Sequence, residues 1–288
     1  MPIVFVLIWS TGFIVARYGM PLSPPMKFLA TRYALSILCF LPWIVIAKVP
    51  WPQSRAQWRH LAITGIFMHA CYLGGVWAAV RAGMGSGLTA LIVGLQPVLT
   101  AFWLSSRRDP VHGSQITQRQ WAGLLLGLVG LVIVVSRKFG TGGEVGWLNM
   151  SLIIGALLGI TIGTLYQKRF VQPCDVRTAN VVQLGAALLA TLPLAWAEPD
   201  AMQWNAQLMG AMAWSVLALT LGGSSLLYLL IQRGAAASVS SLMYLVPPCT
   251  ALLAWLLFSE PITAVTIAGT LITAVGVSLV VRPQKVAL

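Results

Sequence analysis

The amino-acid sequence predicts an all-α membrane protein with ten transmembrane helices, arranged as two inverted repeats of five helices each. Composition is the first observation behind this prediction. Of the 288 residues, 58% are hydrophobic and 8% are charged, whereas about 25% of the residues in a soluble domain carry a charge. The mean hydropathy is +0.85. A soluble fold of this size could not bury so much apolar surface, so the composition excludes that class.

The second observation is a series of ten apolar segments that short polar loops connect. Most are close to the length of about 20 residues with which a helix crosses the hydrocarbon core of a bilayer. No basic region precedes the apolar part of the first segment and no small-residue cleavage site follows it, so we expect a transmembrane helix and not a removable signal. The segments cover residues 3–20, 27–47, 58–80, 86–106, 120–136, 148–168, 178–197, 208–231, 236–258 and 263–281.

The third observation is similarity between residues 1–138 and residues 147–283, which we interpret as two copies of one unit. With a shift of 150 residues, LQPVLTA aligns with LVPPCTA. With a shift of 146 residues, GLLLGLVGLVIVV aligns with GTLITAVGVSLVV. Because each copy has an odd number of helices, the second copy enters the membrane in the opposite orientation. The result is an inverted-topology repeat.

Basic residues predict the orientation of the chain. The net charge is +12, and twelve Lys and Arg residues lie on the side of the chain termini against six on the other side. Positive loops face the cytoplasm, so we expect a multi-pass protein of the cell inner membrane with both termini in the cytoplasm. Loop charges that set orientation explain the positive charge without nucleic acid as a partner. The expected partners are the lipid bilayer and a small molecule, and a homodimer stays open.

The sequence contains no motif for a cofactor, a metal or a catalytic centre. The four cysteines are scattered without metal-ligand spacing. There is no P-loop, no HExxH and no Gly-x-Ser-x-Gly, and no acidic residue lies in the middle of an apolar segment. We therefore expect no cofactor, no metal and no enzyme. An intramembrane enzyme and a structural membrane protein are the alternatives from other classes.

Prolines interrupt the fourth and ninth segments at matching positions, Pro97 in the first half and Pro247 and Pro248 in the second. A proline removes one backbone hydrogen bond and bends or breaks a helix. A pair of such helices, one in each half, indicates a binding site between inverted repeats. We expect these prolines to form helix breaks that take part in gating.

Polar and aromatic residues inside the apolar segments are candidates for the lining of a cavity, because polar groups in a membrane are costly and often functional. We expect the cavity between helices one, three and four and their counterparts six, eight and nine. The alternative for the hydroxyl groups is a bond to a carbonyl one turn back, and for His69 it is an interhelical hydrogen bond. The candidates are Trp9, Ser10, His69, Tyr72, Trp77, Gln96, Thr161, Thr164, Ser224, Tyr228, Ser241 and Tyr244.

Two further features of the helices carry expectations. Arg32 lies near the outer membrane boundary, where it is a candidate for contact with an anionic group or for snorkelling to the interface. Gly155, Gly159 and Gly163 are spaced by four residues. This spacing predicts a helix face on which a neighbouring backbone can approach closely.

Three stretches carry a family resemblance. They are WSTGFIVAR in the first segment, TRYALS in the second, and FSEPITAVTIAGTLITAVGVSLVV at the end. With them the sequence resembles the EamA-type drug/metabolite transporters over essentially its whole length. The counterpart of FSEPIT in the first half, SSRRDPVHGSQIT, departs from the family pattern because it lacks the acidic residue directly after the helix.

The resemblance implies a secondary transporter that works by alternating access, commonly an exporter of amino acids, metabolites or drugs. It does not imply a particular substrate. A nucleotide-sugar or sugar-phosphate carrier is the alternative within transport. Such a carrier would need several basic residues inside its cavity.

Overall fold

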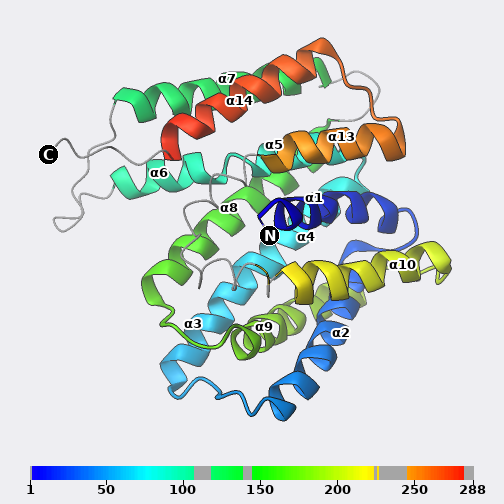
Figure 1. Ribbon diagram of the computed structural model, residues 1–288. Coiled ribbons are helices and arrows are strands. Elements are labelled where there is room, and N and C mark those ends of the chain that lie inside the picture. The colour runs from blue at the N-terminus through cyan, green and yellow to red at the C-terminus, as the bar shows by residue number, and fades with distance from the viewer. Residues whose placement is uncertain (1, 107–117, 139–144, 224–225, 227–244, 282–288) are drawn as a thin grey trace, which may run out of the picture.

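The computed structural model describes residues 2–106, 118–138, 145–223, 226 and 245–281. The regular elements of these ranges are helices (Figure 1). The first half contains α1 (Pro2–Gly19), α2 (Pro25–Ile46), α3 (Arg55–Gly65), the π-helix η1 (Ile66–Cys71), α4 (Tyr72–Arg81), α5 (Ser86–Val93), α6 (Gln96–Ser106) and α7 (Gln118–Lys138). The second half contains α8 (Trp147–Phe170), α9 (Val176–Ala197), α10 (Ala206–Trp214), the π-helix η2 (Ser215–Gly223), α13 (Val246–Phe258) and α14 (Ala264–Val281).

The lengths and composition of the helices match a membrane protein. Five helices of the described ranges are long and apolar enough to cross a membrane: Pro25–Ile46, Arg55–Arg81, Trp147–Phe170, Val176–Ala197 and Ala206–Gly223. Five shorter apolar helices are Ile3–Gly19, Ser86–Thr100, Trp121–Ser136, Val246–Phe258 and Ala264–Leu279. Leucine, valine and tryptophan side chains are exposed on the outside of several of these helices, as contact with lipid requires. The predicted all-α membrane fold is confirmed.

Helix α8 runs antiparallel to the continuous helix that α3, η1 and α4 form. At the start of α8, Asn149 Nδ2 donates to the carbonyl of Ala82, just past the end of α4, at 3.3 Å. Just past the end of α8, the backbone N–H of Gln172 donates to Gln57 Oε1, in the first turn of α3, at 3.1 Å. These contacts define two ends of the bundle. We call the end with Gln57 the Gln57 end. The opposite end, where α4 ends and where Lys27 lies in the first turn of α2, is the Lys27 end.

Corresponding helices of the two halves run in opposite directions. Helix α1 ends at the Lys27 end, where the Arg81 side chain donates to the carbonyl of Met20. Its counterpart α8 begins at that same end. The same reversal holds for α2, which begins there, and its counterpart α9, which ends there near Glu198. The predicted inversion of the two five-helix repeats is confirmed.

The last helices of the two repeats, α7 and α14, pack against each other along one edge of the molecule (Figure 1). Glycines on both helices allow close approach. A Cβ atom on Gly130 would lie 2.5 Å from the carbonyl oxygen of Gly269, and one on Gly276 would lie 2.6 Å from the carbonyl oxygen of Gly123. The glycines that recur in the two aligned sequence stretches therefore form one symmetric interface.

The stretch FSEPIT ends α13 and caps another helix. Ser259 has a positive φ of 53°, and the chain leaves α13 through a left-handed turn. The turn brings the Glu260 carboxylate to the start of α5, where it accepts the N–H groups of Ser86 at 3.0 Å and Gly87 at 3.4 Å. A carboxylate at a helix start satisfies free N–H groups and complements the helix dipole. Glu260 thus ties the ninth helix of the fold to the fourth.

The prolines of the fourth and ninth helices lie at helix beginnings. Helix α6 begins one residue before Pro97, and α13 begins one residue before Pro247 and Pro248. Proline fits the first turn of a helix because its missing N–H would have no partner there. In the first half a short break separates α5 from α6. A Cβ atom on Gly94, within this break, would lie 3.1 Å from Pro247 Cγ, so the proline-bearing regions of the two repeats touch.

The predicted glycine face on α8 is correct in part. A Cβ atom on Gly159 would lie 3.1 Å from Cys71 Cβ, and one on Gly163 would lie 2.6 Å from Met68 Cγ. Both glycines therefore pack against η1. The expectation is wrong for Gly155, around which nothing lies within 4 Å. Because four residues turn an α-helix by about 400°, the face drifts by about 40° at each step, and Gly155 points away from the neighbour.

Replacement of a glycine at the α4–α8 contact tests this packing. A Cβ atom on Gly75 would lie 2.7 Å from the carbonyl oxygen of Leu152 and 2.9 Å from Ala156 Cβ. We expect Gly75→Ala to lower the free energy of unfolding by about 1–3 kcal/mol, because the two helices must separate. Gly155→Ala is the matched control and should leave stability unchanged or raise it. Thermal unfolding in detergent measures both variants, and equal midpoints for the two would contradict the packing.

Candidate substrate cavity

A cavity lies between helices of both repeats. The first repeat contributes α1, α2, η1 and α4, and the second contributes α8, α9 and η2. Its volume is about 130 Å³. An engineered apolar cavity of similar size, about 150 Å³, binds benzene. Apolar walls with a few polar groups are typical of small-molecule sites. The lining consists of Trp9, Gly12, Phe13, Arg32, Tyr33, Met68, His69, Tyr72, Leu73, Val76, Trp77, Ile160, Asn180, Leu184, Leu219 and Thr220.

Two π-helical segments form walls of the cavity at equivalent positions in the repeats. Segment η1 lies in the third helix of the first repeat and contributes His69. Segment η2 lies in the third helix of the second repeat and contributes Thr220. With a shift of 151 residues, His69 aligns with Thr220. π-Helical segments occur often at functional sites, and here the repeat symmetry brings two of them to one cavity.

Hydroxyl groups satisfy carbonyls in both π-helical segments. Tyr33 Oη donates to the carbonyl of His69 at 2.9 Å. Thr220 Oγ1 donates to the carbonyl of Ser215 at 2.9 Å. A π-helical segment disturbs the regular ladder of backbone hydrogen bonds, and an unpaired polar group inside a membrane costs several kcal/mol. These two hydroxyl groups therefore stabilise the cavity walls.

Arg32 brings a positive charge into the cavity wall. Its side chain extends from α2 of the first repeat, and the residue is 8% exposed. Nε and Nη2 donate to Thr220 Oγ1 in η2 of the second repeat, at 3.2 and 3.1 Å. Because this guanidinium is bound inside the bundle, snorkelling to the interface does not describe it. No carboxylate of the described residues lies within ion-pair distance of Arg32.

Aromatic rings form much of the remaining wall. Trp77 is 1% exposed and stacks on Phe28 with ring centroids 4.4 Å apart. Trp9 packs against Phe5 with centroids 5.4 Å apart. Gly12, one turn after Trp9, lines the cavity beside Leu219, and a Cβ atom there would lie 3.8 Å from Leu219 Cδ2. The rings are fixed by their neighbours, so the wall presents rigid aromatic surface to a ligand.

The cavity brings together five of the residues singled out in the sequence and several that were not. Trp9, Arg32, His69, Tyr72 and Trp77 line it. The sequence reasoning missed Tyr33 and Thr220, although Tyr33 directly follows Arg32 in TRYALS. It also favoured helix four over helices two and seven, whereas α2 and α9 contribute to the described lining and α5 and α6 do not.

Other candidates lie elsewhere. The hydroxyl groups of Ser10 and Thr161 donate to carbonyls one turn back in their own helices, at 2.7 Å each. This is the alternative to a role in the cavity lining that the sequence leaves open for hydroxyl groups. Gln96 Nε2 donates to Thr164 Oγ1 at 3.0 Å and links α6 to α8 outside the cavity lining. The remaining candidates lie outside the described residues: Ser224, Tyr228, Ser241 and Tyr244.

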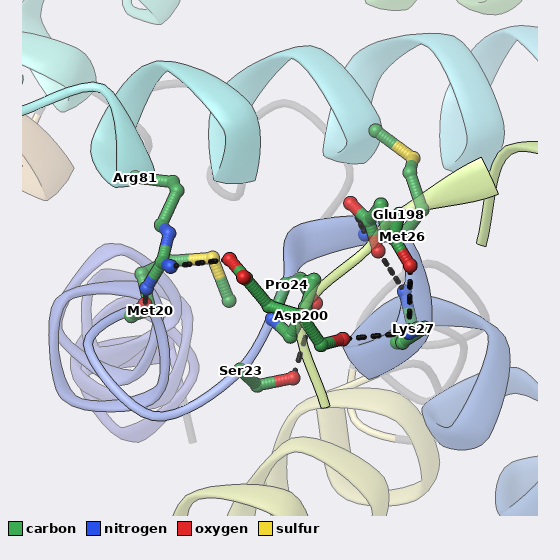
Figure 2. Close-up of polar contacts among 8 residues, drawn as sticks. All are labelled: Met20, Ser23, Pro24, Met26, Lys27, Arg81, Glu198 and Asp200. Atoms are coloured by element: carbon green, nitrogen blue, oxygen red, sulfur yellow. Dashed lines mark hydrogen bonds and ion pairs between the residues drawn. The ribbon is translucent and has the colours of Figure 1, made fainter. Parts of the chain in front are cut away.

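Charged and backbone groups join the two repeats at the Lys27 end (Figure 2). Lys27 Nζ donates to the carbonyls of Glu198 and Asp200 at 2.8 and 2.6 Å, and the Glu198 carboxylate accepts the backbone N–H of Lys27 at 2.9 Å. Arg81 donates to the Met20 carbonyl and pairs with Asp200 at 3.3 Å. The loop after α9 is thus connected to α2 through Lys27 and to α4 through Arg81. An exposed ion pair of this kind contributes little stability, so it can break and re-form.

A second set of contacts joins the repeats at the Gln57 end. Gln57 Nε2 donates to the carbonyl of Gln172 at 2.8 Å, and His60 Nδ1 lies 2.8 Å from Tyr166 Oη. These side chains link α3 to the end of α8. The repeats are therefore connected on both sides of the cavity.

Asp175 begins α9 at the Gln57 end. Its carboxylate accepts the backbone N–H of Arg177 at 2.9 Å and pairs with Arg177 Nη2 at 2.8 Å. Hydrogen bonds from the Arg177 side chain hold the pKa of this carboxyl below its usual range. A lowered pKa in the folded state means that the contribution to stability is present at neutral pH and is lost as the pH falls through that pKa.

The profile of the EamA-like transporter family matches residues 1–136 and 147–282, one match for each half. The chain belongs to the EamA-like transporter family. The resemblance of the three stretches to this family is thereby confirmed. With its apolar helices, the chain is a membrane transporter of the EamA type whose substrate the family does not specify.

Individual relatives share about a fifth to a quarter of their residues with this EamA chain. It is 23% identical to the uncharacterized transporter YvbV of Bacillus subtilis, over 97% of this chain and 90% of the relative. It is 24% identical to the uncharacterized inner membrane transporter YedA of Escherichia coli K12, over 64% of this chain and 57% of the relative. It is 21% identical to a probable amino-acid metabolite efflux pump of Salmonella typhimurium, over 67% of this chain and 60% of the relative.

A solved crystal structure has a similar fold. It aligns with a TM-score of 0.65 over 97% of this EamA chain and 95% of that chain, at 16% sequence identity. At this level of identity the similarity shows the fold alone.

Removal of one hydroxyl group tests the role of the π-helical segment. Tyr33→Phe leaves the carbonyl of His69 without its donor, and we expect the free energy of unfolding to fall by about 1–3 kcal/mol. Tyr72→Phe is the matched control, because among the described residues the Tyr72 hydroxyl donates no hydrogen bond to a carbonyl. Thermal unfolding in detergent compares them. A loss of stability in Tyr72→Phe as large as that in Tyr33→Phe would contradict the role of this hydrogen bond.

Proposed function

We propose that this chain is a secondary transporter that moves a small organic metabolite, an amino acid or a drug-like molecule, outward across the inner membrane by alternating access. The observation that carries the proposal is the cavity between the two inverted repeats, with contacts between the repeats on both sides of it. Binding near the interface of inverted repeats, followed by rocking of one bundle against the other, is the general mechanism of such folds.

The contacts at the two ends suit opposite roles in this cycle. At the Lys27 end, Arg81 and Asp200 are 37% and 65% exposed in their side chains, and such a pair opens at small cost. When the contacts at the Lys27 end separate and those at the Gln57 end stay, the cavity opens to one side of the membrane. The reverse movement opens it to the other side. The rings around the cavity keep the ligand in place between these movements.

The proposed orientation rests on charge, and the proposed direction of transport rests on the names of relatives. The excess of basic residues on the side of the termini favours a cytoplasmic Gln57 end, which places the Lys27 end outside. Relatives in Salmonella typhimurium and Escherichia coli K12 are named probable amino-acid metabolite efflux pumps, at 21% and 22% identity. The charge gives the orientation of the bundle, and the names of these relatives favour export of a small metabolite.

The alternatives fit the cavity less well. A sugar-phosphate or nucleotide-sugar carrier must neutralise a doubly charged group, and Arg32 is the one Lys or Arg in the lining that the structure describes. An intramembrane hydrolase needs a nucleophile or an acid–base pair. The described lining offers one histidine and one arginine, without a carboxylate or a cysteine. Transport therefore remains the function that these residues support best.

Uptake into inside-out membrane vesicles tests the function. Vesicles from cells that express the chain are compared with empty vesicles across a panel of labelled amino acids and small organic acids, with and without an imposed pH gradient. Uptake above the empty vesicles supports export. A gradient-dependent signal that His69→Ala abolishes would assign proton coupling to His69. Absence of uptake for the entire panel would contradict the proposed class of substrate.

A residue that fills the cavity should stop transport without unfolding the protein. Gly12 lines the cavity, and a Cβ atom there would lie 3.8 Å from Leu219 Cδ2. We expect Gly12→Leu to reduce vesicle uptake to the level of empty vesicles, because the side chain occupies the ligand space. Gly210→Leu is the matched control on an exposed helix face, with nothing within 4 Å of the glycine. Normal uptake by Gly12→Leu at equal expression would exclude this cavity as the transport site.

A further inference from the structure

The chain has very few acidic residues, and the structure describes four of them. There are six, Asp109, Glu144, Asp175, Glu198, Asp200 and Glu260. Four of them are engaged away from the cavity, in the capping and pairing contacts described above. The other two lie outside the described residues, in sequence stretches between predicted transmembrane segments. Residues 224–244 contain no acid at all.

Arg32 therefore has no acidic partner within the bundle that the structure describes. Its guanidinium is buried in the cavity wall and donates two hydrogen bonds to a neutral hydroxyl group of Thr220. A buried charge is normally paired, because its removal from water is costly. Arginine stays protonated in proteins and offers a planar set of N–H donors that matches a carboxylate. Within the part of the chain that the structure describes, no negatively charged group pairs with Arg32.

We propose that the cavity binds the carboxylate of a small organic acid with an apolar or aromatic body, and that Arg32 is the residue that binds this carboxylate. The proposal rests on the transport function proposed above and names the substrate class of that site. The single positive charge selects one negative charge. The described lining has no acid for an ammonium group, so a monocarboxylate fits it better than an amine.

The rest of the cavity fits the body of such a molecule. Trp9, Phe13 and Trp77 present aromatic surface, and the volume of about 130 Å³ suits a ligand with one ring. Thr220 fixes the guanidinium through Nε and Nη2 and leaves its other N–H groups for a ligand. The carboxylate would lie beside η2, and the apolar body would lie along α1 and α4.

Four compounds with the same ring and different charges test the proposal on the wild-type protein. They are phenylacetate, phenylacetamide, phenethylamine and phenylalanine. Thermal unfolding of the detergent-purified full chain, titrated with each compound, gives apparent affinities. We expect phenylacetate to stabilise the protein and to bind about tenfold or more tightly than the neutral phenylacetamide. Phenethylamine should bind most weakly. Equal affinity for the acid and the amide, or no stabilisation by any of the four, overturns the proposal.

Variants then locate the carboxylate site. Arg32→Gln should reduce the affinity for phenylacetate to that for phenylacetamide, and Arg32→Lys should restore part of the difference by keeping the charge. Arg59→Gln, on the exposed face of α3, is the matched control and should bind phenylacetate as the wild type does. If Arg32→Gln does not fold, the comparison of acid and amide on wild type and Arg32→Lys decides. An unchanged preference for the acid in a folded Arg32→Gln overturns the assignment to Arg32.

Uptake of labelled phenylacetate into inside-out vesicles separates the two proposals. Binding of phenylacetate that depends on Arg32, without uptake, supports the carboxylate site and contradicts the transport function. Uptake of phenethylamine or of a neutral compound, unchanged in Arg32→Gln, supports transport and overturns the carboxylate site.

Discussion

Backbone N–H and C=O groups in the middle of a bilayer find no water, and this constraint governs the walls of the cavity. Regular helices satisfy it within themselves. The two π-helical segments do so with help from side chains, the Tyr33 hydroxyl for the carbonyl of His69 and the Thr220 hydroxyl for that of Ser215. Both π-helical segments line the cavity, so the side chains that satisfy their carbonyls also shape the site.

The same residues couple the site to the rest of the bundle. Thr220 accepts both hydrogen bonds of Arg32, so a charge from the first repeat is held by the second. A ligand that draws the guanidinium toward itself would act directly on the contact between α2 and η2. The ends of the bundle carry further contacts between the two repeats, at Arg81 and Asp200 and at Gln57 and Gln172. Binding and opening thus involve the same pair of repeats.

The sequence predicted the fold well and the site only in part, for physical reasons. Apolar length, odd helix number and the paired Pro97 and Pro247 are local signals, and they predicted the inverted repeats. Which residues line the cavity depends on the rotation of each helix about its axis and on the π-helical segments, and no residue pattern predicts either. Residue type alone therefore selected Ser10 and Thr161 as lining candidates, although their hydroxyl groups donate to carbonyls of their own helices. The contact between Arg32 of the first repeat and Thr220 of the second is known only from the three-dimensional structure.

The most direct test of the account is labelling of a cysteine in the cavity from each side of the membrane. The variant is Gly12→Cys with the four native cysteines replaced by serine or alanine, and its Cβ atom would lie at an ordinary contact distance of 3.8 Å from Leu219 Cδ2. Alternating access predicts that a membrane-impermeant thiol reagent reacts with this cysteine when added to either right-side-out or inside-out vesicles, and that a bound substrate slows both reactions. Labelling from neither side, in a variant that still transports, would contradict the claim that this cavity is the site that opens alternately to the two sides.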